Sequence, residues 1–217
     1  PIADFFTVFA KVEGAEGLSI FLVEKHFSGL AIGREIEKLG VVSLPTSELA
    51  FNDCFVPLTH RLSQAEGDGE IHLKKTLNEI RIITSAMALG IGRAALAEAV
   101  RYSGERVQFG RTIDKFQVIQ LKLAEMATEL EATKVFLMYA AWLCDAGQPH
   151  HLQAAMCKLF STEAAAEVCD KAARVFASYG YAMEYPIQRY LRDVRFTLIG
   201  GGTSEILKLF IARSITA

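Results

Sequence analysis

Three consecutive glycines, Gly200 to Gly202, interrupt helical sequence near the C-terminus, and this break constrains the fold more than any other feature. A short helix beginning at Pro186 leads toward it through Arg192, and Thr203 is placed to cap a second helix running to about Arg213. Glycine lets a backbone approach a ligand closely, and a helix N-terminus offers free N–H groups to an oxygen of that ligand. The sequence therefore predicts a bend where two helices meet a bound molecule.

The first part of the chain has the pattern of strands. Runs of β-branched and aromatic residues, separated by glycine-bearing turns, predict strands at 5–10, 18–23, about 30–32 and 48–53. A polar, glycine-bearing linker follows at 65–70. We therefore expect a partial antiparallel β domain over residues 1–64.

The rest of the chain has helical periodicity. Apolar residues recur at helical spacing in three long segments, at about 71–104, 116–146 and 151–179. Long helices joined by short loops predict an antiparallel bundle. The predicted fold class is thus α+β, with an antiparallel four-helix bundle over residues 65–217.

Net charge, hydropathy and cysteine spacing reduce the number of functional classes to which the chain can belong. A net charge of −2 over 217 residues gives no reason to expect binding to nucleic acid or to an acidic membrane surface. No apolar run reaches the roughly 20 residues of a membrane span, and no signal peptide opens the chain. The four cysteines lack metal-site spacing, which predicts buried thiols in a reducing compartment and no metal site. Because Pro1 stands just before a strand, we expect an N-terminal portion to be missing.

Five local patterns occur in order along the chain. They are Lys38-Leu39-Gly40 with Thr46 to Phe51, Glu105 to Gly110, Phe116-Gln117 with Leu123 to Met126, Tyr179-Gly180-Tyr181 with Glu184-Tyr185-Pro186, and Arg192-Asp193 with Gly202 to Ile206. Together they resemble the C-terminal part of acyl-CoA dehydrogenases, from within the β domain through the helical domain. The resemblance implies FAD as cofactor, an acyl-CoA substrate, a homotetramer or dimer, and an electron-transfer flavoprotein as acceptor. It also implies a bacterial cytoplasmic or mitochondrial matrix location.

The resemblance assigns site residues. Those implied to contact FAD are Arg106, Gln108, Phe109, Phe116, Gln117, Arg174, Thr203, Ser204 and Glu205, with Arg106 and Gln108 reaching the pyrophosphate in a neighbouring subunit. Arg81 and Asn78 are implied to hold the CoA portion. An arginine offers a fork of donors to phosphate oxygens, which suits the role of Arg106.

The catalytic base of the family is missing from both of its usual positions. Oxidising an acyl-CoA at its α and β carbons requires a base for the α-proton, and the family places that carboxylate where this chain has Gly201 or Ile80. Glu79 lies next to the second position, but one residue is about 100° around a helix. Glu205 belongs to the family's ordinary pattern. The catalytic residue is therefore left unknown.

Three functions remain open on this sequence. In the first, the chain belongs to a working dehydrogenase whose base is Glu79, Glu205 or a residue upstream of Pro1. A second possibility is a base-independent acyl-CoA reaction, as in desulfinase-type relatives. A third is a catalytically silent subunit of a heteromeric dehydrogenase. A helical interaction bundle with no enzymatic role explains the helices but not the ordered motifs.

Overall fold

The computed structural model describes residues 1–63 and 65–216. The chain forms two compact units, Pro1–Leu77 and Asn78–Ala217, and the division falls inside a helix. The domain boundary at 64/65 remains a prediction.

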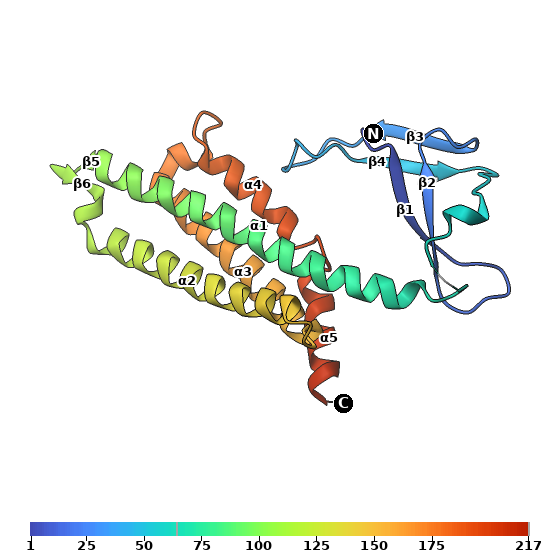
Figure 1. Cartoon of the computed structure of the whole chain (residues 1–217). Helices are drawn as coiled ribbons and strands as arrows, with labels where there is room; N and C mark the ends of the chain where they lie inside the picture. Colours follow the sequence, from blue (N-terminus) through green and yellow to red (C-terminus); the bar gives the residue numbers. More distant parts are fainter. Residues whose placement is uncertain (64, 217) are drawn as a thin grey trace. The chain divides into compact units, whose positions relative to one another are not determined.

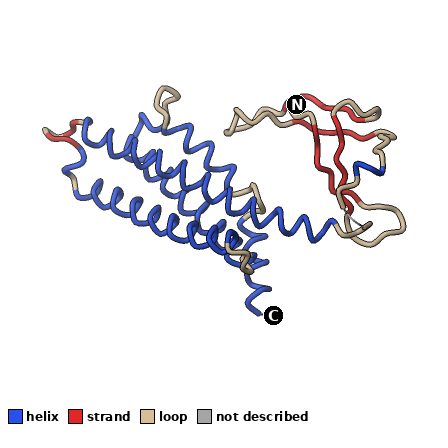
Figure 2. The backbone as a smooth tube through the Cα atoms, viewed as in Figure 1, coloured by secondary structure: helices blue, strands red, loops and turns tan. Residues whose placement is uncertain are grey.

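The first unit contains two antiparallel strand pairs (Figure 2). The first pair joins β1 (Phe5–Ala10) to β2 (Ser19–Glu24), and the second joins β3 (Leu30–Glu35) to β4 (Ser47–Phe51). A short 3-10 helix, η1 (Leu58–His60), follows. All four strands predicted from β-branched and aromatic runs are thus present.

Helices make up almost all of the second unit (Figure 1). The elements that follow η1 are α1 (Gly69–Glu105), β5 (Val107–Gln108), β6 (Arg111–Thr112), η2 (Ile113–Lys115), α2 (Gln117–Asp145), α3 (His151–Phe176), η3 (Ala177–Tyr181), α4 (Ile187–Thr197) and α5 (Ser204–Thr216). The predicted long helices and the two short ones are confirmed. The third helix is shorter than predicted, because the residue after Phe176, Ala177, has a φ of 53° and starts a 3-10 turn.

The hairpin of β5 and β6 was not predicted. Its two tip residues, Phe109 and Gly110, have φ values of 52° and 79°, as in the tight turns that match strand twist. Such turns usually carry Asn-Gly or Asp-Gly, so a Phe-Gly tip gives little sequence signal.

The helical core depends on close approach of small residues. A Cβ added at Gly92 of α1 would lie 2.7 Å from the Leu130 side chain of α2 and 3.6 Å from the Ala165 side chain of α3. At the hairpin end, the Tyr102 ring stacks on the Phe176 ring with 4.1 Å between centroids. The apolar centre of α1 is therefore packed against α2 and α3, as its small residues predict.

Helix α1 is long and apolar enough to cross a membrane, judged by its length and composition alone. An 18-residue window of it has a mean hydropathy of 1.4, and 39% of that window is buried inside the structure. Core helices of soluble proteins can have the same length and hydropathy.

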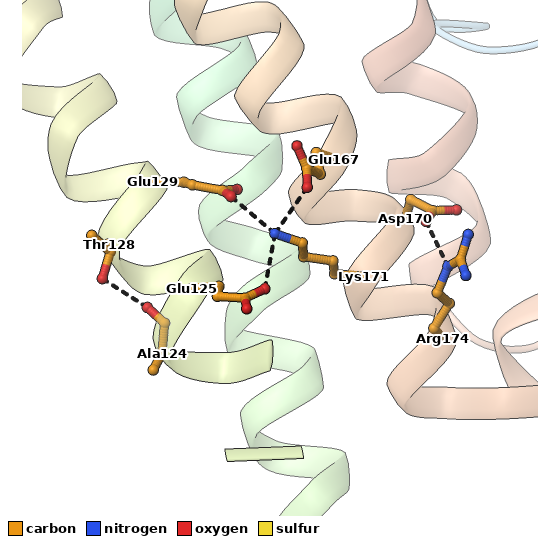
Figure 3. Close-up of polar contacts among 8 residues, drawn as sticks. All are labelled: Ala124, Glu125, Thr128, Glu129, Glu167, Asp170, Lys171 and Arg174. Carbon is orange, nitrogen blue, oxygen red and sulfur yellow. Dashed lines mark hydrogen bonds and ion pairs between the residues drawn. The ribbon is translucent and has the colours of Figure 1, made fainter. Parts of the chain in front are cut away.

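Lys171 of α3 pairs with two carboxylates of α2 and with one of its own helix (Figure 3). The Lys171 Nζ lies 2.9 Å from Glu129, 3.0 Å from Glu167 and 3.2 Å from Glu125. Burial alone would lower the pKa of Lys171, but hydrogen bonds to Glu129, Glu167 and Glu125 raise it. The ammonium thus offsets part of the repulsion among these three carboxylates.

Replacing Lys171 with methionine is expected to destabilise the bundle by about 1–3 kcal/mol, because three carboxylates then face one another without a cation. Urea unfolding of Lys171→Met measures the loss. The double variant Lys171→Met/Glu129→Gln is expected to recover part of it, since one repelling charge is gone. Equal stability of the wild type and the single variant would contradict this.

The cysteines divide into two pairs by burial. Cys157 and Cys169 are buried, whereas Cys54 and Cys144 are half-buried, so the expectation of buried thiols holds for two of the four. Burial raises the pKa of the Cys157 thiol and raises that of Cys169 to about 12.

Native protein treated with iodoacetamide at pH 8 is therefore expected to be alkylated at Cys54 and Cys144 well before Cys157 and Cys169, because the thiolate is the reacting species. Peptide mass spectrometry against time gives the order. Urea-unfolded protein is the control, in which all four thiols should react alike. Early labelling of Cys169 in the native protein would be inconsistent with its burial.

Candidate functional site

The glycine turn lies between α4 and α5, as the sequence predicts. Gly201 and Gly202 have φ values of 73° and 107°, which side chains rarely adopt. The Thr203 hydroxyl accepts a hydrogen bond from the Ile206 backbone N–H at 3.4 Å, so Thr203 caps α5. The bend therefore ends in a capped helix N-terminus.

The two positions that the resemblance gives to a catalytic base lie side by side. A Cβ added at Gly201 would lie 3.4 Å from the Ile80 Cγ2 atom and 3.4 Å from the Thr84 hydroxyl oxygen. Neither Gly201 nor Ile80 can accept a proton. The turn therefore lies close against α1, beside one methyl-bearing side chain and one hydroxyl.

Glu79 and Glu205 lie near Gly201 in the sequence or on α1, but neither has the surroundings expected of a catalytic base. Glu79 is exposed, one residue around α1 from Ile80. A hydrogen bond from its own backbone N–H and one from the Thr203 hydroxyl lower the pKa of Glu205. A lowered pKa weakens a base, and Glu205 is already engaged at the start of α5.

Arg81 is buried next to the turn and carries an unused donor. Its side chain is 8% exposed, and its Nη1 donates to the Asn78 Oδ1 at 3.2 Å. The guanidinium lies over the Phe210 ring, 5.1 Å from the centroid. Its Nε is buried without a hydrogen-bond partner among the described residues, and burial lowers the pKa of Arg81. An anion or carbonyl oxygen of a ligand would satisfy this donor.

Two residues of α3 hold the turn, and sequence reasoning missed both. The Lys158 Nζ donates to the backbone carbonyls of Leu198 and Gly202, and the Ser204 hydroxyl donates to the Glu163 carboxylate at 2.5 Å. The available signal was a lysine among the small apolar residues of the predicted helix, where a cation requires buried partners.

A second group of predicted site residues gathers at the hairpin end of the bundle. A cavity of about 270 Å³ has Arg106 and Gln108 in its lining, together with the start of η3. Phe109, at the hairpin tip, is 91% exposed, and its ring meets the Phe116 ring edge-on at 6.1 Å. Gln117 opens α2 beside Phe116. This end presents an exposed aromatic ring next to an arginine and an amide.

Arg174 is not part of that cavity lining. Its Nε donates to the Asp170 carboxylate at 2.6 Å on the exposed side of α3 (Figure 3). Its assignment to the cofactor stays a prediction.

The two groups lie far apart within the second unit. Residues 82–105 of α1 separate Arg81, beside the glycine turn, from Arg106, beside the hairpin. At about 1.5 Å per residue they are about 38 Å apart along the helix. One chain therefore presents two partial sites rather than one complete site.

Comparison with known proteins shows the class to which this fold and site belong. Residues 67–216 match the model of the acyl-CoA dehydrogenase C-terminal domain. The chain belongs to the acyl-CoA dehydrogenase family, a family of flavoenzymes, and forms its C-terminal part.

Individual relatives agree with this class. Benzylmalonyl-CoA dehydrogenase of Aromatoleum aromaticum is 69% identical, over all of this chain and 58% of its own length. The Caffeyl-CoA reductase-Etf complex subunit CarC of Acetobacterium woodii is 34% identical, over 98% of this chain and 56% of its own length. A solved structure of PigA with FAD and proline superposes with a TM-score of 0.94 at 32% identity, covering 100% of this chain and 57% of that one. The chain thus spans a little over half the length of these relatives.

Proposed function

We propose that the full-length protein is a FAD-dependent oxidoreductase acting at the α and β carbons of an acyl-CoA whose α carbon bears a carboxylate. One observation carries the proposal: Gly201 and Ile80 face each other where a base is expected, and neither has a carboxylate. Losing a general base typically reduces a rate by about 10²–10⁴. An efficient reaction at this site therefore needs another way to free the α-carbon electron pair.

A substrate carboxylate provides that way. When the bond between the α carbon and the carboxylate breaks, carbon dioxide leaves and the electron pair stays on the α carbon, delocalised into the thioester carbonyl. FAD, when bound, would supply the acceptor for the hydride of the β carbon, and the product would be an α,β-unsaturated thioester. No proton is removed from the α carbon. The malonyl unit in the name of the Aromatoleum relative has a carboxylate at this carbon, which supports the choice of substrate.

The surroundings of Gly201 suit this substrate. A substrate carboxylate seated against the Ile80 methyl group would lose hydration on that side, which disfavours the anion relative to neutral carbon dioxide. The Arg81 Nε, buried and without a partner, supplies a donor for an anionic part of the thioester. Asn78 orients Arg81 through its Oδ1.

The residues also fit a flavin dinucleotide, provided that two protomers contribute. Thr203, Ser204 and Glu205 present the N-terminus of α5, while Arg106, Gln108 and Phe109 present the exposed hairpin, about 38 Å away along α1. A dinucleotide is shorter than this span. We infer that each cofactor takes the turn of one protomer and the hairpin of another.

The exposed apolar face of α2 supports a homotetramer or dimer. Val135, Met138, Tyr139 and Trp142 are each 48–65% exposed on this helix. Monomeric proteins rarely expose such a patch, so a second copy of the chain is its expected cover. For the reduced protein we propose an electron-transfer flavoprotein as acceptor, which the Etf complex of the Acetobacterium relative supports.

One substrate pair tests the proposal. The full-length protein is purified, its visible spectrum is recorded for flavin, and it is then mixed anaerobically with benzylmalonyl-CoA or with 3-phenylpropanoyl-CoA. The second thioester is the first without its carboxylate. We expect bleaching and carbon dioxide release with the first only.

The other outcomes overturn the proposal in distinct ways. Equal bleaching with both thioesters would mean an ordinary dehydrogenase with a base elsewhere. Bound flavin that neither thioester bleaches would favour a desulfinase-like reaction or a silent subunit. A full-length protein that stays colourless with excess FAD would exclude the flavoenzyme itself.

A further inference from the structure

Lys158 is a fully buried cation that the proposed chemistry does not use. It lies in α3 and is 0% exposed. Lysine is almost never fully buried unless its ammonium is paired. Its partners therefore indicate what it does.

Those partners are the two ends of the glycine turn. The Lys158 Nζ donates to the Leu198 carbonyl at 3.2 Å and to the Gly202 carbonyl at 2.7 Å. Leu198 is the C-cap residue of α4, and Gly202 directly precedes the cap of α5. One ammonium thus spans the glycines that have positive φ, and it also meets the negative end of the α4 dipole.

A second anchor from the same helix holds the far side of the turn. Glu163 accepts the Ser204 hydroxyl hydrogen bond at 2.5 Å, and Ser204 is the first residue of α5. Glycines restrict a backbone weakly by themselves, so the orientation of Gly201 toward Ile80 depends on such anchors.

We propose that Lys158 is a positioning residue, which fixes the glycine turn to α3 and thereby keeps Gly201 beside Ile80 of α1, where the substrate of the proposed function is seated, and that neutralising its ammonium loosens the turn. The inference rests on the proposed function only for the substrate; the clamp itself stands on the two carbonyl contacts.

The ammonium loses its charge within an accessible pH range. Burial lowers the pKa of Lys158 to about 8; the Glu163 carboxylate on α3 and the Glu205 carboxylate on α5 oppose this, and the Arg81 guanidinium on α1 adds to it. The pKa of a lysine in an unfolded chain is about 10.4. Between these values the unfolded chain holds more protons, so the contribution of this group to global stability rises with pH while the turn loosens. As pH rises from about 8, the contribution of Lys158 to global stability increases while the glycine turn loosens. Faster exchange confined to the turn is therefore distinct from unfolding of the whole protein at alkaline pH.

Hydrogen–deuterium exchange of full-length protein tests the clamp without any substrate. In Lys158→Met we expect backbone amides of residues 198–206 to exchange about tenfold faster or more than in the wild type, because charge-assisted hydrogen bonds are lost. Lys171→Met is the matched control, since it removes another lysine of α3 whose partners are Glu125, Glu129 and Glu167. Because Lys171→Met lowers the stability of the whole bundle, exchange of 198–206 is compared with that of α2 in the same variant, and this ratio should be unchanged. Equal acceleration in both variants, or none in Lys158→Met, would overturn the proposal.

Two further measurements keep the test decisive. If Lys158→Met does not fold, wild-type exchange in 198–206 between pH 7 and 9.5, normalised to unstructured peptide, should show the same loosening; a flat profile would overturn the proposal. If the variant folds, its kcat for benzylmalonyl-CoA should be about tenfold lower than that of the wild type, with flavin retained. In the wild type kcat should fall as pH rises above about 8, and in the variant this fall should be absent. Inactivity of the wild type with every thioester would instead overturn the proposed function and leave the exchange result standing.

Discussion

Ile80→Glu is expected to let the full-length protein oxidise 3-phenylpropanoyl-CoA, at a rate about 10²–10⁴ above that of the wild type. The new carboxylate would lie on α1 beside Gly201, where the helix backbone imposes no strain and 38% of the Ile80 side chain is already exposed. It would supply the base for the α-proton. The same change is expected to slow benzylmalonyl-CoA turnover, because two carboxylates would then compete for one space.

Two further variants isolate the base from the shape of its side chain. Ile80→Gln has nearly the same shape without the charge and should not oxidise 3-phenylpropanoyl-CoA. Gly201→Glu should gain less activity than Ile80→Glu, because a side chain at a φ of 73° is strained. Anaerobic flavin bleaching and steady-state kinetics with both thioesters measure these rates. Equal activity of the Glu and Gln variants at position 80 would refute the role assigned to this space.

Regular elements were predictable from the sequence because their signals are local. The strands at 5–10 and 18–23 alternate β-branched and aromatic residues, and they form β1 and β2. The long helices follow apolar spacing and end near glycine and proline. The hairpin tip at Phe109 lacks the usual turn residues, so it was missed.

The site was predictable only in part because its contacts are long-range. The family resemblance pointed to Gly201 and to Ile80 separately, but only packing of the turn on α1 makes them neighbours. Lys158 gave no motif at all, since its partners are backbone carbonyls 40 and 44 residues away. Backbone acceptors have no side-chain signature, and sequence patterns therefore cannot identify such a contact.

Burial of Arg81 beside the glycine turn is expected to lower the stability of the folded protein and to strengthen substrate binding. Its guanidinium is 8% exposed with an unpaired Nε, and burial lowers its pKa, so the charged form is disfavoured in the folded protein. Buried charges replaced by apolar side chains often leave a protein equally or more stable. A ligand oxygen at Nε would turn this unfavourable donor into a binding contact.

Arg81→Met is therefore expected to lower kcat/KM for benzylmalonyl-CoA by about 10–150-fold, the loss of one charge-assisted hydrogen bond in a buried site. Its stability in urea unfolding should be unchanged or raised by up to about 2 kcal/mol. Arg101→Met, on the same helix, is the control: Arg101 is half-exposed and pairs with Glu98 and Glu105 at the surface, so neither quantity should change much. A stability loss in Arg81→Met with full activity would show that Arg81 serves the fold rather than the substrate.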